Sequence, residues 1–128
     1  MISFAELVLG GSLPIYLQIV LYVKRGMAAG TIQNGDEMPS RRVLSALLGV
    51  NPNTIQKAYR MLEEEGLICS HAGAKSYASV TQSLMARIRR ELLENEVRSL
   101  VEAMKQMGVT REEALELVGT LWEGGGPL

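Results

Sequence analysis

Several features that mark other classes of protein are scarce or missing in this sequence. The 128 residues include one cysteine, so no internal disulfide can form and a reducing compartment is expected. Aromatic residues make up only 5%, which favours an aliphatic, helical core over a β-sandwich or barrel. No apolar run is long enough to span a membrane, and no basic residues precede the apolar N-terminus as they would in a signal peptide. We therefore expect a cytoplasmic protein without membrane association.

Groups of residues that support catalysis or metal binding are also missing. The sequence holds no phosphate-binding loop and no recognisable nucleophile–base pair. Cys69 and His71 lie close together, but one Cys and one His cannot complete a metal site. The three consecutive acids Glu63, Glu64 and Glu65 point in different directions on a helix, so they indicate a solvated end. We expect no enzyme activity, no catalytic residue, no metal and no cofactor.

An excess of cations is likewise missing, since the net charge is -1. Residues 1–80 hold seven Lys/Arg against six Asp/Glu, a balance that would not by itself indicate a nucleic-acid binder. The placement of these charges is more informative. Residues 38–62 contain cations and no acids. A positive segment of this kind is one feature of a surface that binds nucleic acid.

Apolar spacing predicts three helices in the first half of the chain. The first begins near Pro14 and ends at Gly30, with an apolar stripe formed by Tyr16, Ile19, Val20, Val23 and Met27. The second is capped by Ser40 and ended by Gly49, with a buried face of Val43, Leu44, Leu47 and Leu48. The third is capped by Asn51 and stops at Gly66, with Ile55, Ala58, Tyr59 and Leu62 facing inward.

The second and third helices are separated by a very short connection that contains Gly49. Two short helices joined in this way form the pattern of a helix-turn-helix. In that motif the N-terminal part of the second helix enters the major groove of DNA. Short amide and hydroxyl side chains suit base edges, whereas cations suit guanine or phosphate. The residues predicted to contact DNA here are Arg42, Asn53, Thr54, Gln56, Lys57 and Arg60.

Two short strands are predicted at 67–71 and 75–80, on either side of Ala72–Ala74. A hairpin that follows a helix-turn-helix forms a wing, so the expected fold is mainly α, a winged helix-turn-helix over residues 1–80. Gly73 and Lys75 at the tip of this wing are further candidates for DNA contact.

Residues 81–128 are predicted to form a helical dimerisation segment. A long helix spans 82–107, and the pair Thr110 and Glu113 has the spacing of a capping box that opens a last helix through Trp122. The apolar face of the long helix is wider than the short last helix can cover, so a homodimer interface is expected. Its predicted residues are Leu92, Val97, Leu100, Val101, Met104, Leu121 and Trp122. Little volume is expected for an enclosed effector pocket within one subunit.

The segment 14–68 resembles the DNA-binding domain of GntR-family transcriptional regulators, and "NPNTIQKAY" is similar to the YtrA-like subfamily. The pieces that carry the resemblance are Pro14-Ile15-Tyr16, Gln18-Ile19, Gly30, Gly35, Pro39-Ser40, Arg42, Leu48-Gly49-Val50 and Glu64-Glu65-Gly66-Leu67-Ile68. They cover about half of the chain in order and in register. The remainder matches the subfamily only in length and helicity.

The resemblance implies a function and a set of contacts. It implies a DNA-binding regulator, expected here to be a dimeric repressor at a palindromic operator. It places DNA contacts at Arg42, at Gly73 and at the recognition-helix positions Asn51, Asn53, Thr54, Gln56 and Lys57. This sequence departs from the family at Arg41, where an acid is usual, which adds a cation and makes Arg41 a further candidate for DNA contact. It also departs in the wing, where Gly73-Ala74-Lys75 replaces Gly-Arg-Gly. Insertion of the wing into the minor groove therefore stays open.

The alternative is a winged-helix adaptor that binds proteins and not DNA. Neutralising positions 42 and 57 separates the two, because only a DNA binder would lose its ligand. The sequence does not identify the operator, the target genes, the direction of control or a small-molecule effector.

Overall fold

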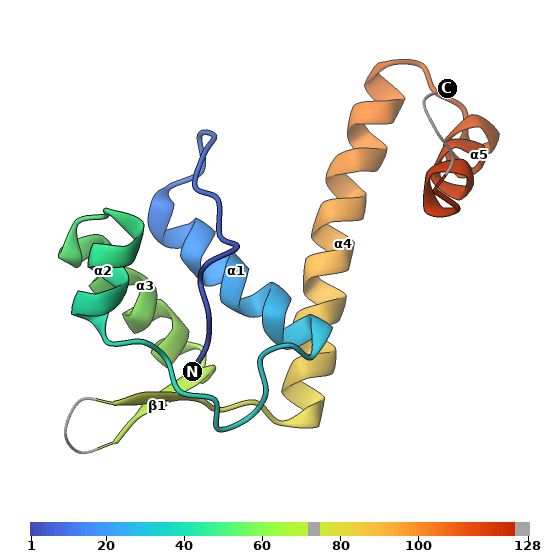
Figure 1. The fold of residues 1–128 in the computed structure, drawn as a ribbon. Coiled ribbons are helices and arrows are strands. Elements are labelled where there is room, and N and C mark those ends of the chain that lie inside the picture. The colour runs from blue at the N-terminus through green and yellow to red at the C-terminus, as the bar shows by residue number, and fades with distance from the viewer. Residues whose placement is uncertain (72–74, 125–128) are drawn as a thin grey trace. The chain divides into compact units, whose positions relative to one another are not determined.

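The computed structural model describes residues 1–71 and 75–124. It divides into two compact units, Met1–Arg90 and Glu91–Leu128. The predicted division of roles after residue 80 stays a prediction. In chain order the elements are α1 (Ile15–Ala29), α2 (Arg41–Leu48), α3 (Pro52–Glu64), β1 (Ile68–Ser70), β2 (Ser76–Ala78), α4 (Gln82–Gln106) and α5 (Arg111–Trp122) (Figure 1).

Helix α3 is the centre of the first unit, since it packs on α1, α2 and β1. Its inward side chains are completely buried, as predicted: Ile55, Ala58, Tyr59 and Leu62. Helix α1 contributes Ile19, Val20, Val23 and Met27 to the same core. The three predicted helices are therefore confirmed, together with the side of α3 that faces away from the core.

The predicted buried face of α2 is only partly correct. Leu44 is fully buried and Leu48 is half-buried, but Val43 and Leu47 are 54% and 60% exposed. A helix of eight residues presents one narrow side to α3. Val43 and Leu47 lie about 100° around the helix axis from Leu44 and Leu48, which takes them off that side.

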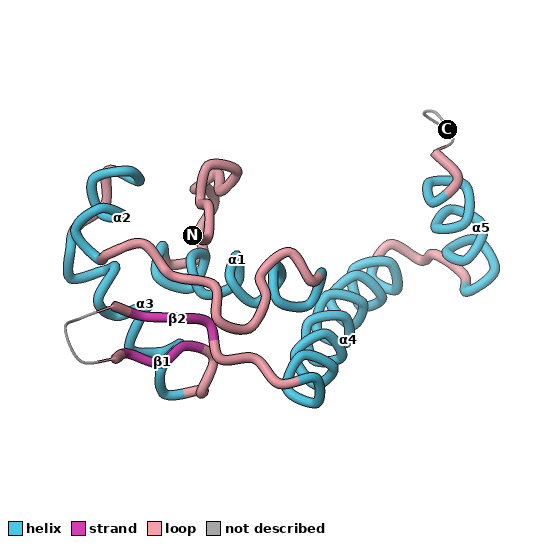
Figure 2. The backbone as a smooth tube through the Cα atoms, turned by 60° about the horizontal axis from the view of Figure 1, so that its bottom comes forward, coloured by secondary structure: helices cyan, strands magenta, loops and turns pink. Residues whose placement is uncertain are grey.

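The wing forms as predicted, with shorter strands. Strands β1 and β2 pair antiparallel, with Cys69 opposite Tyr77 (Figure 2). The segment before α2 lies along the other edge of β2, a pairing that the sequence did not predict: the Met38 amide donates to the Ser76 carbonyl at 2.8 Å, and the Ala78 amide donates to the Asp36 carbonyl at 2.7 Å. The hairpin is therefore held through both strands, since β2 is hydrogen-bonded to the segment before α2 and β1 contacts α3.

The N-terminal segment, whose form the sequence left open, packs against α1. Ile2 and Phe4 are buried, and the Phe4 ring stacks on Tyr22 with 5.1 Å between centroids. The Tyr22 hydroxyl donates to the Ser3 carbonyl at 2.8 Å. This backbone is irregular, so it has no periodicity by which sequence could place its buried residues.

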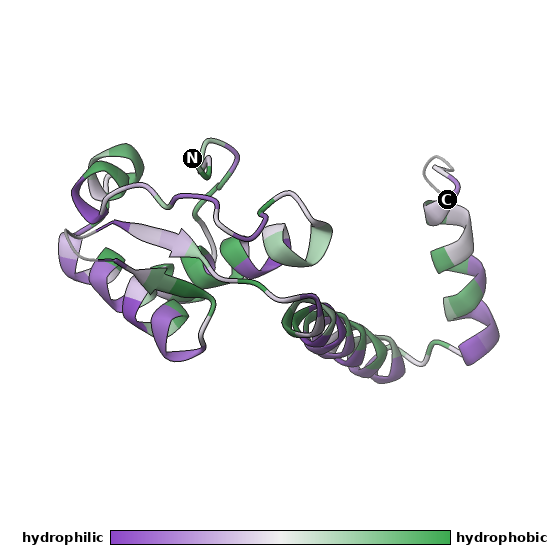
Figure 3. Ribbon diagram, turned by 90° about the horizontal axis from the view of Figure 1, so that it is seen from below, coloured by the Kyte–Doolittle hydropathy of each residue, from purple (hydrophilic) through white to green (hydrophobic). Residues whose placement is uncertain are grey.

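The second unit holds the rest of α4 and the whole of α5. The predicted capping box is present: Thr110 Oγ1 accepts from the Glu113 amide at 3.2 Å, and Glu113 Oε1 accepts from the Thr110 amide at 3.4 Å. Figure 3 shows α4 with one apolar and one polar side. Within the described residues, no helix combines the length and the apolar character needed to cross a bilayer.

Candidate nucleic-acid interface

The turn between α2 and α3 fixes the start of the candidate recognition helix. Gly49 ends α2 in the left-handed conformation, with φ 65°, which glycine adopts without strain. The Ser45 hydroxyl donates to the Val50 carbonyl and holds the turn closed. Asn51 Oδ1 then accepts from the Asn53 amide at 2.8 Å, and Pro52 occupies the first helical position. Asn51 therefore acts as the predicted cap, and its contact with DNA stays a prediction.

The outward side of α3 collects four of the predicted DNA-contacting residues. Asn53, Gln56, Lys57 and Arg60 follow helical spacing on the side opposite the buried stripe. Gln56 is half-buried and the other three are exposed. Thr54, also half-buried, flanks this row. The row offers amide groups for base edges and two cations, with no acid between them.

Two of the three acids that follow this row are paired with cations from other helices. Glu65 accepts from Lys24 Nζ of α1 at 2.8 Å, and Glu63 accepts from an Arg41 guanidinium nitrogen at 2.8 Å. Arg42, in contrast, is exposed on α2 and has no ion pair with another described residue, nor has Arg60. Their charges are therefore available to an anionic ligand.

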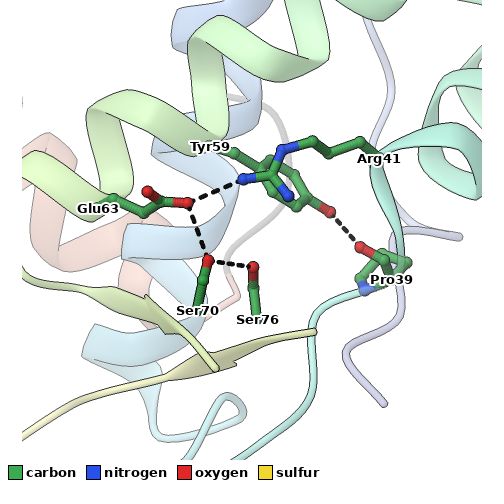
Figure 4. A network of polar contacts seen from close by, with 6 residues as sticks. All are labelled: Pro39, Arg41, Tyr59, Glu63, Ser70 and Ser76. Carbon is green, nitrogen blue, oxygen red and sulfur yellow. Dashed lines mark hydrogen bonds and ion pairs between the residues drawn. The ribbon is translucent and has the colours of Figure 1, made fainter. Parts of the chain in front are cut away.

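Arg41 belongs to a polar network that joins α2, α3 and the wing (Figure 4). Its guanidinium lies 4.8 Å from the centroid of the Tyr59 ring. Glu63 Oε1, which accepts from Arg41, also accepts from the Ser70 hydroxyl at 3.2 Å, and Ser70 is hydrogen-bonded to Ser76 at 3.0 Å. Arg41, which departs from the family pattern, thus finds its counter-ion within the domain.

Tyr59 is the buried polar group of this network. Its hydroxyl donates to the Pro39 carbonyl at 2.6 Å, which anchors the segment that leads into α2. Burial raises the pKa of Tyr59 well above its ordinary value of about 10, although the neighbouring Arg41 acts in the opposite direction. The neutral phenol is therefore the form that stabilises the fold.

We predict that Tyr59→Phe lowers the free energy of unfolding by about 1–3 kcal/mol at pH 7, because the buried Pro39 carbonyl loses its donor. Above pH 10 the unfolded chain ionises this tyrosine before the folded chain does, so the stability of the wild type falls as pH rises. Urea unfolding between pH 7 and 11 checks both points. The difference in free energy of unfolding between wild type and variant should become smaller at high pH. A difference that stays constant would contradict the raised pKa of the buried Tyr59.

The tip of the wing is only partly covered by the structure. Gly73 lies outside the described residues. The Lys75 side chain is 68% exposed, and its Nζ is 4.0 Å from Glu37 Oε1, at the limit for an ion pair. On the first-strand side of the hairpin, Cys69 Sγ and His71 Nε2 are 4.0 Å apart. Contact of Lys75 with DNA stays a prediction.

Tyr16, predicted as part of the apolar stripe of the first helix, is not among the buried residues of α1. It is half-buried in the first turn of α1, and its ring lies beneath Lys57 of α3, with Nζ 4.0 Å from the ring centroid. Sequence reasoning missed this contact because Tyr16 and Lys57 lie on different helices, more than forty positions apart in the chain. The apolar stripe that includes Tyr16 predicted an inward-facing residue but did not show which side chain would cover its ring.

In the second unit, most of the predicted dimer residues are exposed. Val97, Leu100, Leu121 and Trp122 are 50–85% exposed, and Val101 is 36% exposed. Part of this surface lines a groove of about 540 Å³ between the last turns of α4 and the first turns of α5. The volume is larger than the sequence led us to expect. The half-exposed lining shows that the groove is open, whereas a small-molecule site usually encloses its ligand.

Comparisons with known proteins agree with this arrangement. Residues 15–77 match the family described as "Bacterial regulatory proteins, gntR family". The chain is 36% identical over 118 residues to YhcF of Bacillus subtilis, named an uncharacterized HTH-type transcriptional regulator, covering 89% of this chain and 94% of YhcF. It is 35% identical over 96 residues to YtrA of the same organism, an HTH-type transcriptional repressor, covering 75% and 69%.

Solved structures confirm the winged-helix fold. A GntR family transcriptional regulator from Listeria monocytogenes matches with a TM-score of 0.79 at 30% identity, over 88% of this chain and 98% of the other. The DNA-binding domain of AraR, solved in complex with operator ORX1, matches with a TM-score of 0.52 at 26% identity, over 58% and 95%. The named relatives are transcriptional regulators and not enzymes. The chain therefore belongs to the GntR family of bacterial regulatory proteins.

Proposed function

We propose that this cytoplasmic protein represses transcription by binding a palindromic operator as a homodimer. The observation that carries the proposal is the outward row of α3, where Asn53, Gln56, Lys57 and Arg60 share one side without an intervening acid. Two of the comparisons add support. YtrA is named a repressor, and the AraR domain was solved on its operator.

In this proposal, residues in the first two turns of α3 contact the DNA bases. The N-terminal residues of a recognition helix reach furthest into the major groove. Asn53 and Gln56 carry amide groups that can pair with adenine through two hydrogen bonds, and Thr54 can contact a thymine methyl or a base edge. The half-buried position of Gln56 limits the directions in which its amide can point.

Cations in and around the outward row of α3 are proposed to contact the DNA phosphates. We assign these contacts to Arg42, Lys57 and Arg60, none of which is neutralised by a carboxylate among the described residues. Arg41 contributes by holding α2 on α3, because its charge is offset by Glu63. Lys75 supplies a further contact from the wing if the wing reaches the duplex.

We predict that Gln56→Ala relaxes the preference at one base position in each half-site. The expected loss of discrimination is about 1–3 kcal/mol at that position, because a bidentate pair distinguishes one base from the others. Selection of bound duplexes from a random-sequence pool, run in parallel for wild type and variant, measures this. A loss spread evenly over all sequences would instead make Gln56 a backbone contact.

The dimer is proposed to form through the second unit. Val97, Leu100, Val101 and Met104 face one side of α4, and the first three are 36–53% exposed. Contiguous exposed apolar surface on a regulator usually marks an interface. Covering it with a second copy would match the two-fold symmetry of a palindrome and double the number of phosphate contacts. An effector, if one exists, would have to fit the open groove or a site completed by the second copy.

A further inference from the structure

Three of the cations near α3, Lys24, Arg41 and Lys57, are held in two different ways. Arg41 and Lys24 are held by carboxylates, those of Glu63 and Glu65. Lys57 is held by an aromatic ring, since its Nζ lies 4.0 Å from the centroid of the Tyr16 ring. A cation at this distance over the face of a tyrosine is attracted by the negative charge of the π-system.

The two kinds of contact differ in how much of the positive charge stays available to a DNA phosphate. A carboxylate neutralises its cation and competes with phosphate for it. An aromatic face is uncharged, so Lys57 keeps its full charge while its position is restricted. The ammonium group also carries three N–H donors, which allows it to meet a phosphate or base while it stays over the ring.

Restricting the side chain before binding has a thermodynamic consequence. Lysine has a flexible four-carbon stem, and ordering it at an interface opposes association. Tyr16 lies in the first turn of α1 and is half-buried, so the fold fixes its ring independently of DNA. Part of the ordering of Lys57 is thus complete in the free protein.

We propose that Tyr16 is a positioning residue for DNA binding, which holds the Lys57 ammonium ready on the recognition helix without neutralising it. This inference rests on the proposed function. It assigns a role in recognition to α1, which is otherwise a core helix, and it links Pro14-Ile15-Tyr16 at the start of that helix to the outward side of α3.

The test is a double-mutant cycle on binding to a fluorescein-labelled 30-bp duplex of random sequence at low salt. Tyr16→Leu should weaken binding about two- to five-fold for each recognition helix, the size of an exposed cation–π contact. Tyr16→Phe keeps the ring and should bind within about two-fold of wild type. In a Lys57→Met background, Tyr16→Leu should have no further effect. Equal losses in both backgrounds, or no loss in the wild-type background, would overturn the inference.

A second measurement on the free protein reads the geometry directly. The ring current of Tyr16 should shift the ε-methylene protons of Lys57 upfield in NMR spectra of wild type and Tyr16→Phe, and this shift should disappear in Tyr16→Leu. Its absence from the wild type would refute the inference even if Tyr16→Leu fails to fold. If the wild type binds no duplex at all, the proposed function fails and the inference fails with it. Retained wild-type binding without the coupling refutes the inference alone.

Discussion

Leu100→Glu should convert the protein to a monomer and weaken operator binding by about 10²- to 10⁴-fold. Leu100 is 50% exposed and lines the groove on α4 together with Val97, Val101 and Met104. A carboxylate on this apolar face would have to be desolvated in the dimer, which prevents association. When one DNA-binding domain of a dimer is bound to its half-site, the other meets the second half-site at a high effective concentration. That advantage is lost when the subunits separate.

The matched control is Ser99→Glu, which adds the same charge to the neighbouring position on a different side of α4. It should remain a dimer and bind as the wild type does. Sedimentation at micromolar concentration and circular dichroism report assembly and folding of each variant. A wild type that sediments as a monomer, yet binds a full palindrome tightly as a single subunit, would contradict the dimer.

Neutralising Arg42 and Lys57 together should produce the second large effect. Each lost phosphate contact lowers the slope of log K against log salt by about one for each subunit. At 0.15 M salt the double variant Arg42→Gln, Lys57→Gln should bind on the order of 10²- to 10³-fold more weakly than wild type. Fluorescence anisotropy at several salt concentrations measures both quantities.

The double variant Arg89→Gln, Arg90→Gln is the control for net charge, because it also removes two exposed cations, here from α4. It should leave the salt slope unchanged. If the Arg42→Gln, Lys57→Gln variant shows the wild-type slope, the cations are not at the interface. If it also keeps binding a protein partner that the wild type binds, the adaptor hypothesis would take the place of DNA recognition.

The sequence predicted those parts of the fold that depend on local patterns. Helix caps, left-handed glycines and apolar periodicity act over a few residues, so Ser40, Gly49, Asn51 and the capping box of α5 were each predicted correctly. The outward side of α3 followed from its buried side. These signals were sufficient to predict the helix-turn-helix pattern, whereas the family followed from the resemblance of the motifs in residues 14–68.

The remaining features depend on contacts between distant segments. The ion pair of Arg41 with Glu63, the ring of Tyr16 beneath Lys57 and the pairing of Met38 with Ser76 each join different elements. No local pattern records them. The exposure of Val43 has the same origin, because helical periodicity gives the apolar side of α2 but not the width of the surface that α3 covers.

Selection of bound duplexes from a random-sequence DNA pool tests the central claim most directly. If the protein reads DNA through α3 as a homodimer, the recovered sequences should share an inverted repeat whose half-site centres lie about one or more helical turns apart. A pool that shows no enrichment, or one enriched in a single half-site without a repeat, would contradict the account.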